Sequence, residues 1–352
     1  MKKKQSRELH TKKSVSVKAD TCLGILFAMI LLVGMICFNS EKIKMYFVDL
    51  NGFISHCMGQ HVLNETVLLE SGHLISPEEA WPSEIIEKNA EDLEEFRLFT
   101  ESIGAELLYI TVPAKNVLHE ETLPAGVEDF ASSNLDYFIE CLNETDVEYI
   151  DVRTLLDEEE EPALNYYFLS DHHWKISYGL EFAGYLAEYL SEEMGMNCDT
   201  ALLSPDQFTT VVYEDWHLGS HGRRVGRFFG PGADEFEYIY PSYETMFANV
   251  TTGMEGDFRS ILTGERGLEE RNYYWGFVYD VVYEKIMDQR IDNLLNEDGP
   301  RVYIISDSMG YAVFPFLSLV CDEVCWGGTN EEDIRAFEPD IIIVMRWSRI
   351  LL

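Results

Sequence analysis

The sequence predicts an α/β protein built on a doubly wound parallel sheet. Short apolar runs alternate with helical stretches along most of the chain, and five runs have strand character, namely residues 107–112, 148–152, 302–305, 322–326 and 341–345. Such alternation is typical of parallel strands joined by helices. The length of 352 residues and the hydrophobic content of 46% are sufficient for one large domain that carries an insert.

The N-terminal region divides into a basic tail and an apolar run. Residues 1–20 contain seven Lys and Arg against two acidic residues, and residues 21–38 are eighteen positions without a charge. This pattern predicts one transmembrane helix preceded by a cytoplasmic tail. A cleaved signal peptide is the alternative, but the run is longer than a usual signal core and no small-x-small site follows it. We therefore expect a single-pass protein of the cell membrane whose main domain is extracytoplasmic.

The rest of the chain divides into a stalk at 39–80 and a main domain at 81–352. Between about 197 and 298 the alternation stops and glycines and aromatic residues accumulate, which predicts a loop- and β-rich insert. Its aromatic residues suit either a sugar-binding surface or the ordinary core of the insert. Arg223 and Arg224 lie among glycines there, and two adjacent arginines need a ligand or a carboxylate partner, so both are candidate substrate-binding residues.

The chain is strongly acidic. Its formal net charge is −37, and because residues 1–20 carry +5, the remainder carries −42. An acidic surface of this size repels nucleic acids and anionic lipids, so neither is expected as a partner. Five of the seven cysteines lie outside the apolar run at scattered spacings without nearby histidines. Neither a metal site nor a disulfide framework is predicted from them, and no cofactor is implied.

Asp171, His172 and His173 form the first candidate catalytic block, in a turn between an apolar run and a helical stretch at 175–190. A carboxylate two residues before an imidazole can fix the tautomer of the imidazole and stabilise its protonated form. Residues two apart in such a turn can project to the same side. We therefore expect Asp171 to contact His173 and His172 to point away.

Ser308 is the candidate nucleophile, far downstream. The β-branched run 302–305 leads directly into Asp307-Ser308-Met309-Gly310, which places Ser308 on the turn at the carboxyl end of a parallel strand. Each residue alone has an ordinary explanation, because a histidine is usually structural and a turn serine often caps a helix. Their joint occurrence favours Ser308 as nucleophile, His173 as base and Asp171 as the group that orients His173.

The two blocks together resemble the DHHW family and the related alginate O-acetyltransferase-like proteins. These are SGNH hydrolase-like domains whose serine block lies near the end of the chain through circular permutation. The similarity extends from about residue 112 to residue 352 and is most specific at 170–174. The resemblance implies a fold in which the Asp-His block and Ser308 meet.

The resemblance also implies an oxyanion hole. The backbone N–H of Ser308 is a natural donor, and the family pattern adds a glycine and a polar side chain from later blocks. The Asn block typical of SGNH enzymes is not recognisable, because the run 341–345 leads into Arg346 instead. The candidate oxyanion or substrate contacts are Gly327, Gly328, Asn330, Arg346, Lys115 and Asn116. For Lys115, a solvated side chain is the simpler interpretation.

Three functions fit these residues. The first is an O-acetyltransferase that acetylates a cell-surface or secreted polysaccharide through an acyl-enzyme on Ser308. The second is a carbohydrate acetylesterase with the same triad, and the third is a noncatalytic polysaccharide-binding or assembly protein. The predicted membrane anchor favours the first, because the family commonly works beside a membrane-bound O-acyltransferase that would supply the acetyl groups. The fold does not decide between transfer and hydrolysis.

Overall fold

The computed structural model describes residues 24–35, 39–159, 161–269 and 278–349. The chain forms two compact units that divide between Val48 and Asp49, and the second unit is built around an eight-stranded sheet in the order β5-β4-β13-β11-β12-β10-β8-β9. Five adjacent strands of this sheet run parallel. They are β4 (Glu106–Val112), β5 (Glu148–Asp151), β11 (Arg301–Ser306), β12 (Glu323–Trp326) and β13 (Ile341–Trp347). All five correspond to the predicted strands.

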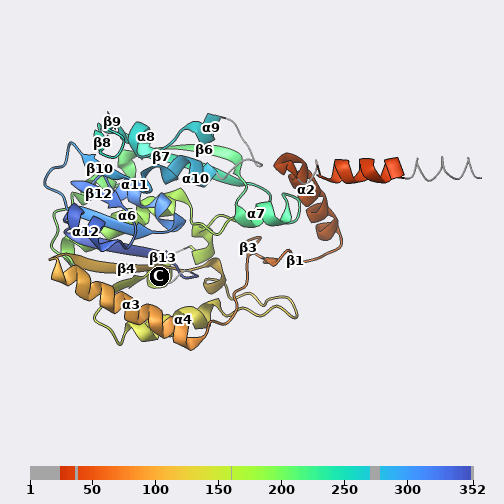
Figure 1. Cartoon of the computed structure of the whole chain (residues 1–352), viewed down its shortest axis with the longest axis horizontal. Coiled ribbons are helices and arrows are strands. Elements are labelled where there is room, and N and C mark those ends of the chain that lie inside the picture. Colours follow the sequence, from red (N-terminus) through yellow and green to blue (C-terminus); the bar gives the residue numbers. More distant parts are fainter. Residues whose placement is uncertain (1–23, 36–38, 160, 270–277, 350–352) are drawn as a thin grey trace, which may run out of the picture. The chain divides into compact units, whose positions relative to one another are not determined.

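Both faces of the parallel strands are buried. Along β4, Leu107 and Tyr109 pack into one hydrophobic cluster, whereas Leu108 and Ile110 pack into the other. This follows from the two-residue period of a strand, and it explains why residues 107–110 of β4 are continuously apolar. The first cluster is covered by α3 (Ser83–Ser102), α4 (Ala131–Leu142) and α12 (Glu331–Phe337), and the second by α6 (Ile176–Glu192), α10 (Val278–Tyr283) and α11 (Phe314–Leu317) (Figure 1). The expected doubly wound architecture is confirmed.

The predicted insert is β-rich, but part of it belongs to the main sheet. The strands β8 (Phe247–Asn249), β9 (Met254–Gly256) and β10 (Arg290–Asn293) extend the sheet beyond β12 as antiparallel strands. A separate hairpin consists of β6 (Phe208–His217) and β7 (Asp234–Pro241). Tyr238 and Phe247 are buried in the main core, so these aromatics have a structural place. The aromatic residues at 273–275, which also belong to the predicted insert, lie outside the described residues.

Short helices complete the second unit. In chain order they are η1 (Lys115–Val117), α5 (Val152–Leu156), η2 (Ala163–Tyr166), η3 (Thr200–Leu203), η4 (Pro205–Gln207), α7 (Ser220–Val225), α8 (Phe258–Ile261), α9 (Arg266–Glu269), η5 (Glu284–Ile286) and η6 (Ser308–Ala312). Two of them, α7 and η6, begin beside the candidate catalytic residues. The first backbone N–H groups of a helix have no partner within it, and here they bind carboxylates: the Ser220 N–H donates to Asp171 and the Met309 N–H to Asp307.

Residues 49–80, which the sequence predicts as part of a stalk, contain ordered structure. They include the end of α2 (Glu41–Cys57) and a three-stranded antiparallel sheet of β1 (Val62–Leu63), β2 (Thr66–Leu68) and β3 (Leu74–Ile75). Leu74 packs against Val225 and Phe229. Asp49 accepts hydrogen bonds from the backbone N–H of Arg227 at 2.9 Å and from its guanidinium at 2.7 Å. This segment therefore packs against α7 and the loop that follows it.

The predicted membrane location requires a correction. None of the helices in the described ranges combines the length and the apolar character that a membrane crossing requires. The described helix that falls within the predicted span covers residues 24–35, which is twelve residues where about 20 are needed. The rest of the span and the predicted tail at 1–20 lie outside the described residues. The prediction of a single-pass protein of the cell membrane is wrong on this finding.

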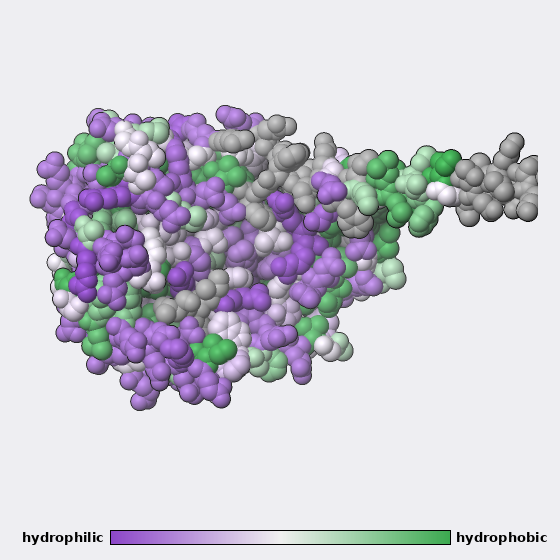
Figure 2. Space-filling view, viewed as in Figure 1, coloured by the Kyte–Doolittle hydropathy of each residue, from purple (hydrophilic) through white to green (hydrophobic). Residues whose placement is uncertain are grey.

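The face of the molecule shown in Figure 2 is mostly hydrophilic. Acidic residues outnumber Lys and Arg by 63 to 26 in the chain, and several of the basic side chains are neutralised by acidic neighbours. Arg97 pairs with Glu94 at 2.8 Å, and Arg153 pairs with Asp151 at 2.7 Å. The excess of negative charge opposes the approach of polyanions.

Candidate active site

Ser308 lies at the carboxyl end of the central strand β11. The strand ends at Ser306, and Asp307 caps the helix η6 that follows, because its Oδ1 accepts the backbone N–H of Met309 at 2.9 Å. The other carboxylate oxygen of Asp307 accepts the backbone N–H of Trp347, at the end of the adjacent strand β13, at 2.7 Å. These two bonds fix the turn, and Ser308 itself stays half-buried.

The Asp-His block lies in a short loop closed by its own backbone. Tyr167 and Trp174 form an isolated antiparallel bridge, and the N–H of Phe168 donates to the carbonyl of His173 at 3.1 Å. The indole N–H of Trp174, fully buried, donates to the carbonyl of Met309 at 2.9 Å. Trp174 therefore ties the histidine loop directly to the serine turn.

The structure brings Ser308, His173 and Asp171 together. His173 Nε2 lies 2.7 Å from Ser308 Oγ, and His173 Nδ1 lies 3.3 Å from Asp171 Oδ2. The ring of Tyr279 stacks on His173 at 4.2 Å between centroids, and its hydroxyl donates to the carbonyl of Ser308 at 3.1 Å. An imidazole held between a hydroxyl and a carboxylate can accept the hydroxyl proton while it remains oriented.

The carboxylate of Asp171 is fully buried and surrounded by donors. Its Oδ1 accepts the backbone N–H of His172 at 2.7 Å and both the N–H and the hydroxyl of Ser220, at 3.1 and 2.7 Å. Its Oδ2 accepts from His217 Nε2 at 2.8 Å. Gly219 leaves the space for this contact, because a Cβ there would lie 2.1 Å from Asp171 Cβ.

His172 does not point away as expected. Its Nδ1 lies 2.9 Å from Asp171 Oδ1 and 2.7 Å from Ser220 Oγ, and its ring contacts those of His173 and Trp347 at tilted angles. The two histidines contact different oxygens of the Asp171 carboxylate, His172 at Oδ1 and His173 at Oδ2. Adjacent side chains thus diverge, but both stay in contact with Asp171. The side chains of Asp171, His172 and His173 have ligand-type atoms within 4.8 Å of one another. These atoms are engaged in hydrogen bonds, and we assign no metal to them.

The protonation states of the pair suit base catalysis. Burial lowers the pKa of His173 to about 4, with His172 adding to this effect and Asp171 opposing it. Burial by itself raises the pKa of Asp171, but the charges of His173 and His172 and their hydrogen bonds outweigh burial and hold it well below its ordinary value. At neutral pH the imidazole is therefore neutral and the carboxylate ionised.

Lys115 is buried and does not have the solvated side chain that the sequence suggested as its simpler interpretation. Only 2% of its surface is exposed, and its ammonium donates to the carbonyls of Phe168 and Asp171 at 2.8 Å and of Leu169 at 3.0 Å. Burial lowers its pKa to about 7, whereas Asp234 and Asp171 favour the charged form. Lys115 thus clamps the histidine loop to the end of β4.

Asp234 holds the same loop through its backbone N–H groups. Its Oδ1 accepts the N–H of Leu169 at 2.7 Å, and its Oδ2 accepts the N–H of Ser170 at 2.9 Å. The Ser170 hydroxyl also donates to this carboxylate and accepts the N–H of Gly219 at 2.9 Å. Sequence reasoning missed Asp234, His217, Ser220 and Tyr279, because they come from three separate segments and no local pattern distinguishes them.

Two of the remaining predicted substrate-contact residues, Asn116 and Arg224, make hydrogen bonds within the protein. Asn116 donates to the carbonyl of Ser76 and to Asp129, both at 2.7 Å, and Arg224 donates to Ser76 Oγ at 2.7 Å. Arg223, in the same helix α7, is half-buried. The role of both arginines in substrate binding stays a prediction, and it is the Ser220 N–H at the start of α7 that binds the Asp171 carboxylate.

The predicted oxyanion contacts beyond Ser308 also differ. The N–H of Gly327 donates to the carbonyl of Ile304 in β11 at 2.9 Å, so it is engaged in a backbone hydrogen bond between strands. The Gly328 carbonyl accepts the Tyr303 hydroxyl, and Asn330 caps α12 by accepting the N–H of Glu332 at 2.8 Å. Such caps are the ordinary use of an Asn at this position.

Arg346 lies at the end of β13, where it pairs with Thr111 of β4. Its Nε is buried and has no hydrogen-bond partner in the described part of the chain. Burial raises the pKa of Asp307, and the charge of Arg346 is one of the influences that oppose this rise. Arg346 is thus close enough to the serine turn to act on it electrostatically.

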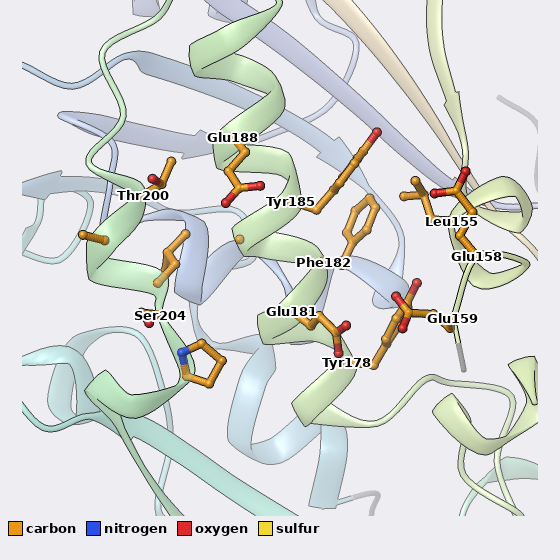
Figure 3. Close-up of a pocket in the computed structure, with 14 residues that line it drawn as sticks. Leu155, Glu158, Glu159, Tyr178, Glu181, Phe182, Tyr185, Glu188, Thr200 and Ser204 are labelled. Carbon is orange, nitrogen blue, oxygen red and sulfur yellow. The ribbon is translucent and has the colours of Figure 1, made fainter. Parts of the chain in front are cut away.

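A pocket of about 590 Å³ lies beside α6, away from these residues (Figure 3). Tyr178, Glu181, Tyr185 and Glu188 of α6 point toward it, and none of Ser308, His173 and Asp171 lines it. Burial and the neighbouring Glu159 raise the pKa of Glu181. The pocket is therefore a feature separate from the candidate active site.

Comparison with known proteins places the fold. Residues 76–211 match the family model described as the SGNH hydrolase-like domain of the acetyltransferase AlgX. A comparison with curated proteins finds no match. Among solved structures, Bacillus cereus PatB1 is 16% identical with a TM-score of 0.66, and the match covers 81% of this chain and 96% of PatB1.

Two further solved structures share the fold. A DHHW family protein from Eubacterium siraeum is 18% identical, with 82% of this chain and 92% of that chain covered and a TM-score of 0.57. The O-acetyltransferase domain of Pseudomonas putida AlgJ is 13% identical, with the same coverages and a TM-score of 0.51. These matches confirm the resemblance to the DHHW family and the alginate O-acetyltransferase-like proteins, whose SGNH hydrolase-like fold this chain shares.

Proposed function

We propose that this protein is an O-acetyltransferase that transfers an acetyl group from an acetyl ester donor to a hydroxyl of a polysaccharide, with Ser308 as nucleophile. The observation that carries the proposal is the 2.7 Å contact between Ser308 Oγ and a neutral His173 Nε2, with the buried Asp171 carboxylate on the other ring nitrogen. The AlgX family model and the AlgJ domain, both described as acetyltransferases, support the reaction class.

The first half of the reaction forms an acyl-enzyme. Ser308 Oγ attacks the acetyl carbonyl while His173 Nε2 takes the hydroxyl proton, and the backbone N–H of Ser308 is the proposed donor to the negative charge that develops on the carbonyl oxygen. When the intermediate collapses, His173 returns the proton to the departing oxygen of the donor. Asp171 remains ionised throughout and stabilises the protonated imidazole.

The second half transfers the acetyl group. A sugar hydroxyl gives its proton to His173 Nε2 and attacks the acetyl-Ser308 carbonyl, and collapse of this intermediate restores the Ser308 hydroxyl with the proton from His173. With water as acceptor the same steps give free acetate. A membrane-bound O-acyltransferase is the proposed source of the acetyl donor.

The purified chain, incubated with a chromogenic acetyl ester and a set of oligosaccharides, tests the proposal. Mass spectrometry should show acetylated sugar in excess of free acetate, and a Ser308→Ala variant should give neither. Free acetate alone would indicate an esterase. Binding of oligosaccharide without any turnover of ester would indicate a noncatalytic protein and contradict the proposal.

A further inference from the structure

We propose that His217 is a positioning residue of this active site, which holds Asp171 Oδ2 behind His173 by donating a hydrogen bond to it. His217 is the last residue of β6 and is completely buried. Its Nε2 lies 2.8 Å from Asp171 Oδ2, closer than the 3.3 Å of His173 Nδ1 to the same oxygen. The inference rests on the proposed function, because it assigns a role behind the proposed base.

The surroundings of His217 fix its tautomer. Asp171 is ionised and can only accept, so the proton on His217 lies on Nε2. The other nitrogen, Nδ1, is buried and has no hydrogen-bond partner among the described residues. The ring packs against Phe168 at 4.6 Å and Phe236 at 6.0 Å. Among the described residues, the hydrogen bond that the ring makes is therefore the one from Nε2 to Asp171 Oδ2.

Two imidazoles therefore share one carboxylate oxygen. The hydrogen bond from His217 fixes the rotation of the Asp171 carboxylate and draws on the negative charge that would otherwise act on His173 alone. Without this donor, the carboxylate loses one of the contacts that hold it, and its full charge becomes available to His173. We expect the first effect to slow the reaction and the second to favour protonated His173, which moves the acid limb of the rate to higher pH.

Other titratable groups face the cluster and stay constant in the test. His172 belongs to the same loop, and electrostatic interactions also reach Asp171 or His217 from the other elements packed around them. The groups are Lys115 of η1, His221 of α7, Tyr279 and Asp280 of α10, together with Asp234 of β7, which acts on Lys115. A difference between variants at position 217 alone therefore reports His217.

The test uses His217→Gln and His217→Leu in the full chain. The amide nitrogen of Gln can occupy the place of the imidazole Nε2 and donate to Asp171, whereas Leu fills similar space without a donor. The probe is an arylsulfonyl fluoride, which sulfonylates an activated serine and requires neither an acetyl donor nor a polysaccharide. Intact-mass spectrometry follows the labelling of Ser308 across pH, and thermal melting shows which variants are folded.

We expect the Gln variant to label within about threefold of the wild type and with the same acid limb. The Leu variant should label at least about tenfold more slowly at its plateau, with its acid limb at higher pH. His217→Asn is the second donor-deficient variant, in case the Leu variant does not fold. It keeps an amide but is one methylene shorter than Gln, so its nitrogen does not reach Asp171, and it should behave as Leu does.

Equal rates and equal acid limbs in the Gln and donor-deficient variants would overturn the role of His217, because packing alone would then explain its presence. A wild-type protein that is not labelled at Ser308 would instead overturn the proposed nucleophile, and the inference with it. The two failures are distinguishable, since the first occurs in a protein whose wild type is labelled.

Discussion

The serine turn and the histidine loop contribute the two halves of the candidate active site, and they are held in different ways. The serine turn depends on its immediate neighbours, because Asp307 caps η6 and binds the adjacent strand end. The histidine loop depends on distant segments. Lys115 holds its carbonyls, Asp234 holds its N–H groups, and His217 and Ser220 hold the Asp171 carboxylate.

The difference follows from the position of each half in the fold. A turn at the end of a central parallel strand is already fixed by the strand pairs on both sides of β11. The histidine loop lies outside the sheet and buries an ionised carboxylate, and burial of such a charge is tolerated only where donors satisfy it. The loop therefore requires long-range partners that the serine turn does not.

The largest effects should come from the two reacting groups themselves. Ser308→Ala and His173→Ala should each lower turnover by about 10³-fold or more, and the double variant should lose little beyond either single one, because the two residues act as a unit. Acetyl-ester turnover measures this. Ser306→Ala is the matched control in the same turn, since its hydroxyl donates only to the Asp307 carbonyl, and it should stay active. If the loss of turnover in the double variant equals the product of the two single losses, Ser308 and His173 do not act as a unit.

Gly219→Ala should break the histidine half without touching the serine half. The added methyl group would lie 2.1 Å from Asp171 Cβ, so the carboxylate or α7 must shift. We expect turnover to fall about 100-fold, with a lower melting temperature. Gly184→Ala in α6 is the control, because nothing lies within 4 Å of its added carbon and Ala favours a helix interior. Full activity in the Gly219→Ala variant would show that catalysis tolerates a shift of the Asp171 carboxylate or of α7.

Lys115→Met should destabilise the histidine loop, because it removes the hydrogen bonds from the ammonium to the backbone carbonyls of the loop. The change leaves three carbonyls without the ammonium that they bind, so we expect a loss of about 2 kcal/mol or more in the free energy of unfolding. Urea unfolding followed by fluorescence measures it. Turnover should fall about tenfold, in kcat more than in KM, because the base is displaced and no substrate contact is lost. Lys88→Met, an exposed lysine of α3 paired with Asp92, should change neither quantity measurably. A selective rise in KM would instead favour the substrate contact predicted from the sequence.

The pH dependence should separate the buried base from an ordinary histidine. The pKa of His173 is lowered from 6.5 to about 4, so the neutral base persists to low pH and the acid limb of kcat/KM should lie near pH 4. The same shift affects stability with a definite sign. The unfolded chain binds the proton more readily, so the contribution of neutral His173 to stability is present above pH 6.5 and is lost as the pH falls toward 4. An acid limb near pH 6.5 would show that His173 is more solvated than this structure indicates.

The smallest effect should come from Asn330→Ala. The side chain caps α12, so its loss should lower the free energy of unfolding by about 1 kcal/mol and leave turnover unchanged. Thermal unfolding and ester turnover measured on the same samples test both statements. A loss of turnover at unchanged stability would restore Asn330 as an oxyanion contact.

The sequence alone predicted the five parallel strands and the position of Ser308, because both follow from local patterns. The runs 107–112 and 302–305 are apolar apart from Thr111, as expected of strands buried on both faces, and the second run leads directly into Asp307 and Ser308. The spacing of Asp171 and His173 also identified the pair. In each case the physical cause lies within a few residues of its effect.

Only the tertiary structure decided which groups surround that pair. His217, Ser220 and Asp234 lie next to the histidine loop because β6, α7 and β7 pack against it. The fold also buries Lys115 against this loop, where the sequence had suggested a solvated side chain. Partners separated by 46 to 65 residues leave no periodic pattern in a single sequence, since their proximity depends on the path of the whole chain.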